Sequence, residues 1–347
     1  MSRKVGGRPT IGDVARESGV GRMTVSRVVN GGELVSAATA ARVRAAIRKL
    51  RYEPNEAARM LKGQSSRTIG LIVPDLADTF FSICAHSVQQ LAAKQGYLTL
   101  LLASERDRDS EARELAMMRS RNVAGILIVP SSPDSIGQLK DVRARGVPVV
   151  MLDRTFPGLD AAAVMVENEE GAKKAVFHLL EHGHKSVFCA GYDSQFNSIG
   201  LRIEGYQKAM AEAGLKPELF IAEEASAVCP RIIKRLRSPK PPTALFTLNN
   251  VTTINVLQAL QRENIRVPQD LAVIGFDDFE MAPLLSVPLT AVRQPAAELG
   301  RTATHLLLEW IRSKSTEKRP VNPQIILPTE LIIRRSCGCE VIRKTWD

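Results

Sequence analysis

The sequence lacks the features that mark membrane, secreted and disulfide-stapled proteins. No run of apolar residues is long enough to span a bilayer, and the first ten residues, M-S-R-K-V-G-G-R-P-T, contain no hydrophobic stretch of the kind that directs secretion. The five cysteines are odd in number and do not have the spacing of a disulfide framework, which agrees with a reducing compartment. We therefore expect a cytoplasmic protein.

Motifs of catalysis are also missing. The sequence contains no G-x-S-x-G, no H-E-x-x-H and no phosphate-binding P-loop, and the G-x-x-x-x-G from Gly200 to Gly205 falls where we expect a helix to begin. We predict a protein that is not an enzyme and needs no cofactor.

Two groups of residues have the chemistry of metal ligands. Cys337 and Cys339 form a C-G-C that could bind a metal or form a strained disulfide, but no second cysteine pair and no histidine is near them in sequence. His178, His182 and His184 have metal-like spacing, yet we interpret them as a helix end, where histidine suits the helix dipole. We expect two bystander thiols and no metal site.

Almost all of the net positive charge lies in the first fifth of the chain. Residues 1–67 hold 14 Lys and Arg against 5 Asp and Glu, whereas the remaining 280 residues hold 33 against 32. A basic module attached to a nearly neutral body is the electrostatic pattern of phosphate binding, so we expect a nucleic-acid partner.

The segment from Thr10 to Asn30, T-I-G-D-V-A-R-E-S-G-V-G-R-M-T-V-S-R-V-V-N, predicts two short helices around a glycine turn, the pattern of a helix-turn-helix. Thr10 and Asp13 form a capping-box-like start, and Gly19 ends the first helix. Ser36 can cap a third helix that completes a small module. A helical hairpin with a solvated basic face would give the same pattern, but the charge distribution argues against it.

The stretch Y-E-P-N-E-A-A-R-M-L-K-G-Q-S-S-R (Tyr52 to Arg67) joins this module to the rest. Pro54 and Asn55 mark a helix start, and glycine and serine follow. It is either a simple tether or a hinge helix that forms on DNA, with Met60 and Leu61 able to wedge into a minor-groove step.

From Thr68 onward, apolar β-branched runs alternate with amphipathic helices, which predicts parallel sheets covered on both faces. About 280 residues exceed one doubly wound sheet, so we expect two lobes with a cleft between them. Polar or turn residues follow several runs, and because strand carboxyl ends line the ligand crevice, we expect them to converge. They are Asp75, Asp153, Tyr192, Asn249 and Asp277.

These motifs, in this order, resemble the LacI/GalR family of bacterial transcription regulators from Thr10 to about Cys339. The resemblance is carried by D-V-A-R-E-S-G-V, M-T-V-S-R-V-V-N, V-S-A-A-T-A-A-R-V-R-A-A-I, Y-E-P-N-E-A-A-R-M-L, I-G-L-I-V-P-D, L-D-R, I-G-F-D-D and L-T-A-V-R-Q-P. It implies an α/β fold class: an all-α helix-turn-helix headpiece and a two-lobed core like that of type I periplasmic binding proteins, built of parallel doubly wound sheets. The expected parts are a headpiece at 1–52, a hinge helix and linker at 53–67, a core at 68–340 with crossovers near 168, 295 and 327, and a short tail at 341–347.

The resemblance also implies which residues meet DNA. Arg22, Met23 and Arg27 match positions that read base edges in the major groove, and Leu61 matches a hinge leucine that enters the minor groove. The remaining expected DNA-binding residues, several of which match phosphate-holding positions, are Thr10, Thr24, Ser26, Asn30 and Asn55. Gly21 replaces the usual serine or threonine cap of the second helix. Because glycine is an acceptable cap, we expect this to weaken the start of the helix only modestly, with no loss of function.

An effector site is implied in the same way. Arg202 matches an arginine that hydrogen-bonds the ligand, and Phe80 or Phe81 could stack on a sugar ring or belong to the core. The other expected effector-binding residues are Asp153, Phe196, Asn249, Asp277 and Gln294. Carboxylates, an amide and an arginine can chelate vicinal hydroxyls, which favours a sugar or sugar derivative, although the two carboxylates could instead be helix caps or salt-bridge partners.

Departures from the family pattern put the ligand in doubt. Asp78 and Thr79 replace a common proline, and Asn250 stands where aspartate is common, and we expect all three to border the cleft. Tyr192 and Phe196 could accommodate a purine as easily as a sugar.

The sequence therefore predicts a homodimeric, ligand-responsive repressor that binds a pseudo-palindromic operator and a small molecule, with no membrane partner. The tail is too short for the leucine heptads that hold tetrameric relatives together. The alternative is a solute-binding protein of a sugar transport system, which would need export and has no use for a basic headpiece.

Overall fold

The structure, a computed structural model, describes residues 9–29, 35–53, 66–156, 158–159, 161–192, 196–313 and 322–339. The chain divides into two compact units, Met1–Ser66 and Arg67–Asp347. Of the residues predicted to meet DNA, Asn30, Asn55 and Leu61 lie outside the described residues. No helix among the described residues is long and apolar enough to cross a membrane.

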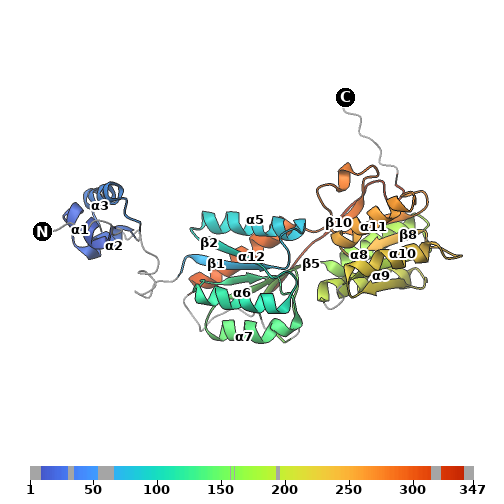
Figure 1. Ribbon diagram of the computed structural model, residues 1–347, viewed down its shortest axis with the longest axis horizontal. Coiled ribbons are helices and arrows are strands. Elements are labelled where there is room, and N and C mark those ends of the chain that lie inside the picture. Colours follow the sequence, from blue (N-terminus) through green and yellow to red (C-terminus); the bar gives the residue numbers. More distant parts are fainter. Residues whose placement is uncertain are drawn as a thin grey trace, which may run out of the picture. The chain divides into compact units, whose positions relative to one another are not determined.

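Within residues 9–29 and 35–53, the first unit forms the helices α1 (Ile11–Ser18), α2 (Arg22–Val29) and α3 (Ala37–Leu50) (Figure 1). Their local signals are as predicted. Thr10 and Asp13 form a reciprocal capping box, Gly19 ends α1 with a left-handed φ of 66°, and Ser36 caps α3. A small core around Val14, Val25 and Val43 holds the helices together, so the predicted helix-turn-helix and third helix are confirmed.

The second unit holds two six-stranded sheets of matching strand order. The first sheet runs β11-β5-β4-β3-β1-β2 and the second runs β12-β10-β9-β8-β6-β7. All neighbouring strands are parallel except β12, which is antiparallel to β10. The strands are β1 (Thr68–Val73), β2 (Leu98–Ala103), β3 (Ile126–Ile128), β4 (Val149–Leu152), β5 (Ala162–Val166), β6 (Val187–Tyr192), β7 (Glu218–Ala222), β8 (Ala244–Thr247), β9 (Ala272–Phe276), β10 (Thr290–Arg293), β11 (Gln324–Leu327) and β12 (Glu330–Ile332).

Helices cover both faces of each sheet, which explains why the strands are nearly continuous apolar runs. In the first lobe α5 and α12 pack on one face and α6 and α7 on the other (Figure 1). In the second lobe α8 and α9 pack on one face and α10 and α11 on the other. The helices are α5 (Thr79–Lys94), α6 (Arg108–Ser120), α7 (Ile136–Ala144), α8 (Asn168–Glu181), α9 (Asn197–Glu212), α10 (Val228–Leu236), α11 (Asn250–Arg262) and α12 (Ala296–Arg312).

The chain passes between the lobes three times: from β5 to α8, from β10 to α12 and from β11 to β12. Each lobe is therefore assembled from segments distant in sequence. The helix pair on one face of each sheet meets at a glycine. A Cβ on Gly205 would lie 2.2 Å from the carbonyl oxygen of Glu169, and one on Gly300 would lie 2.6 Å from that of Cys84, so both contacts require glycine. The predicted two-lobed parallel α/β fold is confirmed.

One expectation about the C-terminal turn is wrong. The sequence shows no histidine near Cys337 and Cys339, but the fold brings His178 and His182, at the end of α8, against their sulfur atoms. The two cysteines are therefore not isolated bystander thiols. Pairing across about 160 residues leaves no local signal in the sequence.

Candidate functional site

The second helix of the headpiece presents a mixed basic and apolar face. Arg22, Met23 and Arg27 are exposed, and Met23 keeps 70% of its surface accessible although it is apolar. Thr24 and Ser26 are half-buried. Such a face suits a DNA groove, because arginine pairs with guanine and an apolar group meets a thymine methyl.

Thr10 is already engaged within the headpiece. Its hydroxyl and its backbone N–H both donate to Asp13 Oδ2, at 2.7 and 2.9 Å, and these bonds hold the pKa of Asp13 below its ordinary value. To donate a hydrogen bond to a DNA phosphate, this hydroxyl would have to give up its bond to Asp13. At the other helix start, the Gly21 carbonyl accepts from the N–H groups of Thr24 and Val25, so α2 begins regularly without a side-chain cap.

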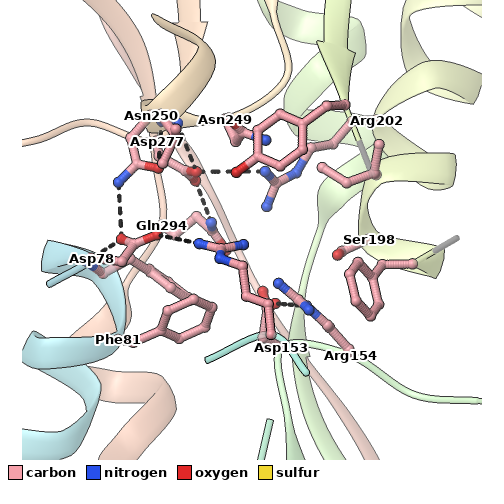
Figure 2. A pocket seen from close by; sticks show the side chains of 16 residues that line it. Asp78, Phe81, Asp153, Arg154, Ser198, Arg202, Asn249, Asn250, Asp277 and Gln294 are labelled. Carbon is pink, nitrogen blue, oxygen red and sulfur yellow. Dashed lines mark hydrogen bonds and ion pairs between the residues drawn. The ribbon is translucent and has the colours of Figure 1, made fainter. Parts of the chain in front are cut away.

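The residues predicted to bind an effector all line one cavity between the two lobes (Figure 2). Phe80, Phe81 and Asp153 come from the first lobe, and Phe196, Arg202, Asn249, Asp277 and Gln294 complete it. Five further residues that line the cavity are not predicted from the sequence. They are Arg106, Arg154, Ser198, Ile199 and Val251, of which Arg154 could have been found in the L-D-R motif.

A buried arginine and carboxylate form the second-lobe side of the cavity. Arg202 is 3% exposed; its guanidinium donates to Asn168 Oδ1 at 2.8 Å and to the Leu248 carbonyl at 2.7 Å, and lies 3.8 Å from the centre of the Phe276 ring. It also pairs with Asp277 Oδ2 at 3.6 Å. These bonds leave Arg202 one orientation, so its position is set before any ligand arrives.

Asp277 is held from three directions. Besides Arg202, Gln294 Nε2 donates to its Oδ1, and the backbone N–H of Asn250 donates to its Oδ2 at 3.3 Å. Burial raises the pKa of Asp277, and the charge of Arg202 and the bond from Gln294 oppose this rise. The carboxylate therefore belongs to a hydrogen-bonded network.

The first-lobe carboxylate is arranged differently. Asp153 is buried; its Oδ2 accepts from Arg154 Nε at 3.1 Å, and its Oδ1 has no hydrogen-bond partner among the described residues. The Arg154 guanidinium lies 3.7 Å from the centre of the Phe196 ring. Phe81 belongs to the first-lobe core, and Phe80 is half-buried and packs against that core. The core interpretation therefore holds for Phe81, and stacking of Phe80 on a ligand stays a prediction.

Asp153 and Asp277 occupy equivalent positions. Each follows the fourth strand of its lobe, and its N–H donates to the next strand, to Val164 and Val292 respectively. Each has a left-handed backbone, with φ of 62° at Asp153 and 76° at Asp277, a conformation that is uncommon outside glycine. Such strain concentrates at functional sites, because it persists only where the surroundings enforce it.

Two hydrogen bonds between side chains of the described residues join the lobes across the cavity. Asn250 Nδ2 donates to Asp78 Oδ1 at 2.9 Å, and Asn197 Nδ2 donates to Thr155 Oγ1 at 2.9 Å (Figure 2 shows the first). Asp78 and Asn250 are both departures from the family pattern, and here they are partners. The remaining cavity is about 40 Å³, room for a few water molecules, so a sugar or a base would require the lobes or side chains to move apart.

Comparison with known proteins agrees with both units. Residues 10–55 match the family described as bacterial regulatory proteins, lacI family, and residues 176–337 match a periplasmic binding protein-like domain. The chain is 33% identical to the HTH-type transcriptional repressor PurR of Aliivibrio salmonicida (strain LFI1238), over 91% of this chain and 97% of the relative.

Two solved structures extend the comparison. The Lac repressor dimer bound to operator and the anti-inducer ONPF superposes with a TM-score of 0.83 at 26% identity, covering 95% of this chain and 99% of that one. The complex of the transcriptional regulator CelR with cellobiose gives a TM-score of 0.68 at 28% identity, covering 95% and 100%.

A helix-turn-helix headpiece and a two-lobed core with a polar cleft define a DNA-binding transcriptional regulator. The chain belongs to the LacI family of bacterial regulatory proteins.

Proposed function

We propose that this protein is an operator-binding repressor whose DNA affinity is controlled by a sugar or sugar derivative bound between the lobes of its core. The observation that carries the proposal is the cavity itself. Each lobe contributes one buried aspartate with a left-handed backbone, and the second lobe adds an arginine held in one orientation. The same chain carries a helix-turn-helix headpiece. A protein of this kind acts in the cytoplasm, where bacterial operators are.

The ligand class follows from what the cavity leaves unsatisfied. Asp153 Oδ1 and Gln294 Oε1 are buried acceptors without a hydrogen-bond partner among the described residues. Sugar hydroxyl groups are donors and would satisfy both atoms, which offsets the cost of burying them. The similarity to a regulator solved with cellobiose points the same way.

A purine is the second candidate, because Phe196 and Tyr192 line the cavity. The guanidinium of Arg154 already lies over the Phe196 ring, so a base stacking on that face would have to displace it. A sugar that hydrogen-bonds beside Arg154 needs no such displacement. The contact therefore favours a sugar.

Control of DNA affinity would come from the lobes. A ligand shifts an equilibrium between two arrangements only by its differential affinity for them, and the closed cavity has no room for a ligand beyond water size. Ligand entry therefore requires the contacts of Asp78 and Asn197 across the cleft to open or adjust. Whether the ligand acts as inducer or corepressor depends on which arrangement binds operator.

The DNA-binding side of the proposal assigns base-edge contacts to Arg22, Met23 and Arg27 and phosphate contacts to Thr24 and Ser26. The assignments of Asn30, Asn55 and Leu61 rest on the sequence resemblance. We propose a homodimer, because the similar Lac repressor is a dimer on its operator.

DNA selection tests this function. Full-length protein would be used to enrich duplexes from a random library, and we expect a pseudo-palindrome whose half-sites lie about one helical turn apart. Arg27→Ala should lower affinity for the enriched site by about 1–3 kcal/mol, whereas Arg237→Ala, which removes an exposed charge from the core, should not. Absence of any enriched sequence, with ligand binding retained, would favour the solute-binding alternative.

A further inference from the structure

The end of α8 and the C-terminal turn bring together four side chains with the donor atoms that transition metals prefer. His178 Nε2 lies 3.3 Å from the sulfur atoms of both Cys337 and Cys339, and Cys339 Sγ lies 2.9 Å from His182 Nε2. The donor atoms of His178, His182 and Cys339 all lie within 4.8 Å of one another. The cluster belongs to the second lobe and is separate from the ligand cavity, none of whose lining residues it shares.

We propose that His178, His182, Cys337 and Cys339 form a binding site for Zn²⁺ or a similar thiophilic divalent ion. Two imidazole nitrogens and two sulfurs are the donor set of structural zinc sites. In a tetrahedral site, nitrogen and sulfur ligands lie about 3.6 Å apart, since zinc binds them at about 2.0–2.1 and 2.3 Å. The three nitrogen–sulfur distances of 3.3, 3.3 and 2.9 Å are within about 0.7 Å of this separation, so small side-chain shifts bring these pairs to the spacing of zinc ligands.

The backbone fixes the spacing of the donors. His178 and His182 are four residues apart at the end of α8 and share one face, with ring centres 4.4 Å apart. Cys337 and Cys339 flank Gly338, whose φ of 95° turns the chain so that both sulfurs meet His178 Nε2. Neither pair would suffice alone.

Surrounding hydrogen bonds prepare two of the donors. His182 Nδ1 lies 2.7 Å from the carbonyl oxygen of His178, so the neutral ring carries its proton on Nδ1 and leaves the lone pair of Nε2 facing Cys339. The Thr290 hydroxyl donates to Cys337 Sγ at 3.1 Å.

The cluster has a buried side and an open side. His178 and Cys337 are buried, Cys339 is half-buried and His182 is exposed, which gives an ion a path from solvent. Both thiols must lose their protons on binding, so two thiolates neutralise the charge of a divalent ion. A bound ion would fasten the C-terminal turn to α8 and so stabilise the second lobe.

Metal analysis of the full-length protein tests the site. After chelation and reduction, the protein would be dialysed against Zn²⁺, and bound zinc and Tm would be measured. We expect one zinc per chain and a higher Tm with zinc, because the ion binds the folded state. Cobalt(II) in place of zinc should give the absorption of a tetrahedral site with a thiolate charge-transfer band.

Variants make the test specific. Cys339→Ser and His182→Gln should each weaken zinc binding more than about a hundredfold, since loss of outer partners alone costs 10–100-fold. His182 is exposed, so its variant keeps the test valid if Cys339→Ser fails to fold. The control is His184→Gln, because His184 bonds Thr243 instead, and it should bind zinc like the wild type. Equal zinc binding by wild type and His182→Gln, or no uptake by fully reduced protein, would overturn the proposal.

Discussion

The two lobes of the core repeat one strand order but hold their strand-end carboxylates in opposite ways. Asp277 in the second lobe is bonded by Arg202, Gln294 and the N–H of Asn250, whereas Asp153 in the first lobe has only Arg154 and one oxygen without a partner among the described residues. The same left-handed backbone presents both. In the second lobe, Asp277 is therefore held in place before a ligand binds. In the first lobe, Asp153 has an oxygen that can accept a hydrogen bond from a ligand.

The residue after each carboxylate shows the same contrast. In the second lobe Asp278 is bonded by Arg293 and Arg334, which ties β9 to β10 and to the segment after β12. In the first lobe the corresponding Arg154 lies over Phe196 of the other lobe. The second-lobe residue therefore makes ion pairs within its own lobe, whereas the first-lobe residue contacts the other lobe.

The largest effect should come from removing the buried arginine. Arg202→Ala leaves Asp277 buried without its cationic partner, so we expect the free energy of unfolding to fall by about 3 kcal/mol in urea titrations. The double variant Arg202→Ala/Asp277→Ala should recover part of this loss, because it removes the unpaired charge as well. A double variant that loses the sum of both single effects would show that the two residues are not coupled.

Removing the ion pairs of Asp278 with Arg293 and Arg334 should lower the free energy of unfolding by a smaller amount that depends on pH. Burial alone would raise the pKa of Asp278, but bonds from Arg334 and Arg293 lower it below its ordinary value. The stability it contributes is therefore present above about pH 4 and lost as the pH falls through the folded-state pKa.

Asp278→Asn should accordingly lower the free energy of unfolding by about 2 kcal/mol at pH 7. This is less than for a fully buried ion pair, because Arg293 is half exposed. The difference from wild type should shrink toward pH 3 in denaturant titrations. A difference that does not depend on pH would contradict the ion-pair origin.

A charge placed at the contact across the cleft should open the lobes. Asn250→Asp replaces the donor to Asp78 with a second carboxylate. We therefore expect the free energy of unfolding to fall by about 1 kcal/mol and the radius of gyration in solution scattering to increase. Gln258→Glu makes the same chemical change on the exposed side of α11 and should leave the radius unchanged. Equal radii for all three proteins would rule out a role for this contact in closure.

The smallest change in stability should come from Asp153. Asp153→Ala leaves Arg154 its bond to the Pro130 carbonyl and its contact with the Phe196 ring, so the free energy of unfolding should change by less than about 1 kcal/mol. A loss as large as that of Arg202→Ala would contradict the contrast between the lobes.

Local signals made much of this molecule predictable. Thr10, Gly19 and Ser36 act within one helical turn, and the rule that parallel strands end at one edge brought the predicted effector residues to one cavity. Two strands have only weak patterns in the sequence. β5 is rich in alanine, and β7 lies at a sheet edge and is only partly buried.

Pairings between distant segments were not predictable from one sequence. Asp78 and Asn250 are 172 residues apart, and His182 and Cys339 are 157 apart. The positive φ angles of Asp153 and Asp277 also leave no mark in residue type, because aspartate serves equally as a cap or an ion-pair partner.

A thermal-shift comparison of wild type and Asp153→Ala tests the central claim most directly. Both proteins would be screened against cellobiose, monosaccharides, sugar phosphates and purines, since a ligand of the folded state raises Tm. We expect a sugar that raises the Tm of the wild type and has little effect on the Tm of Asp153→Ala. A compound that raises both equally, or a panel in which only purines act, would contradict it.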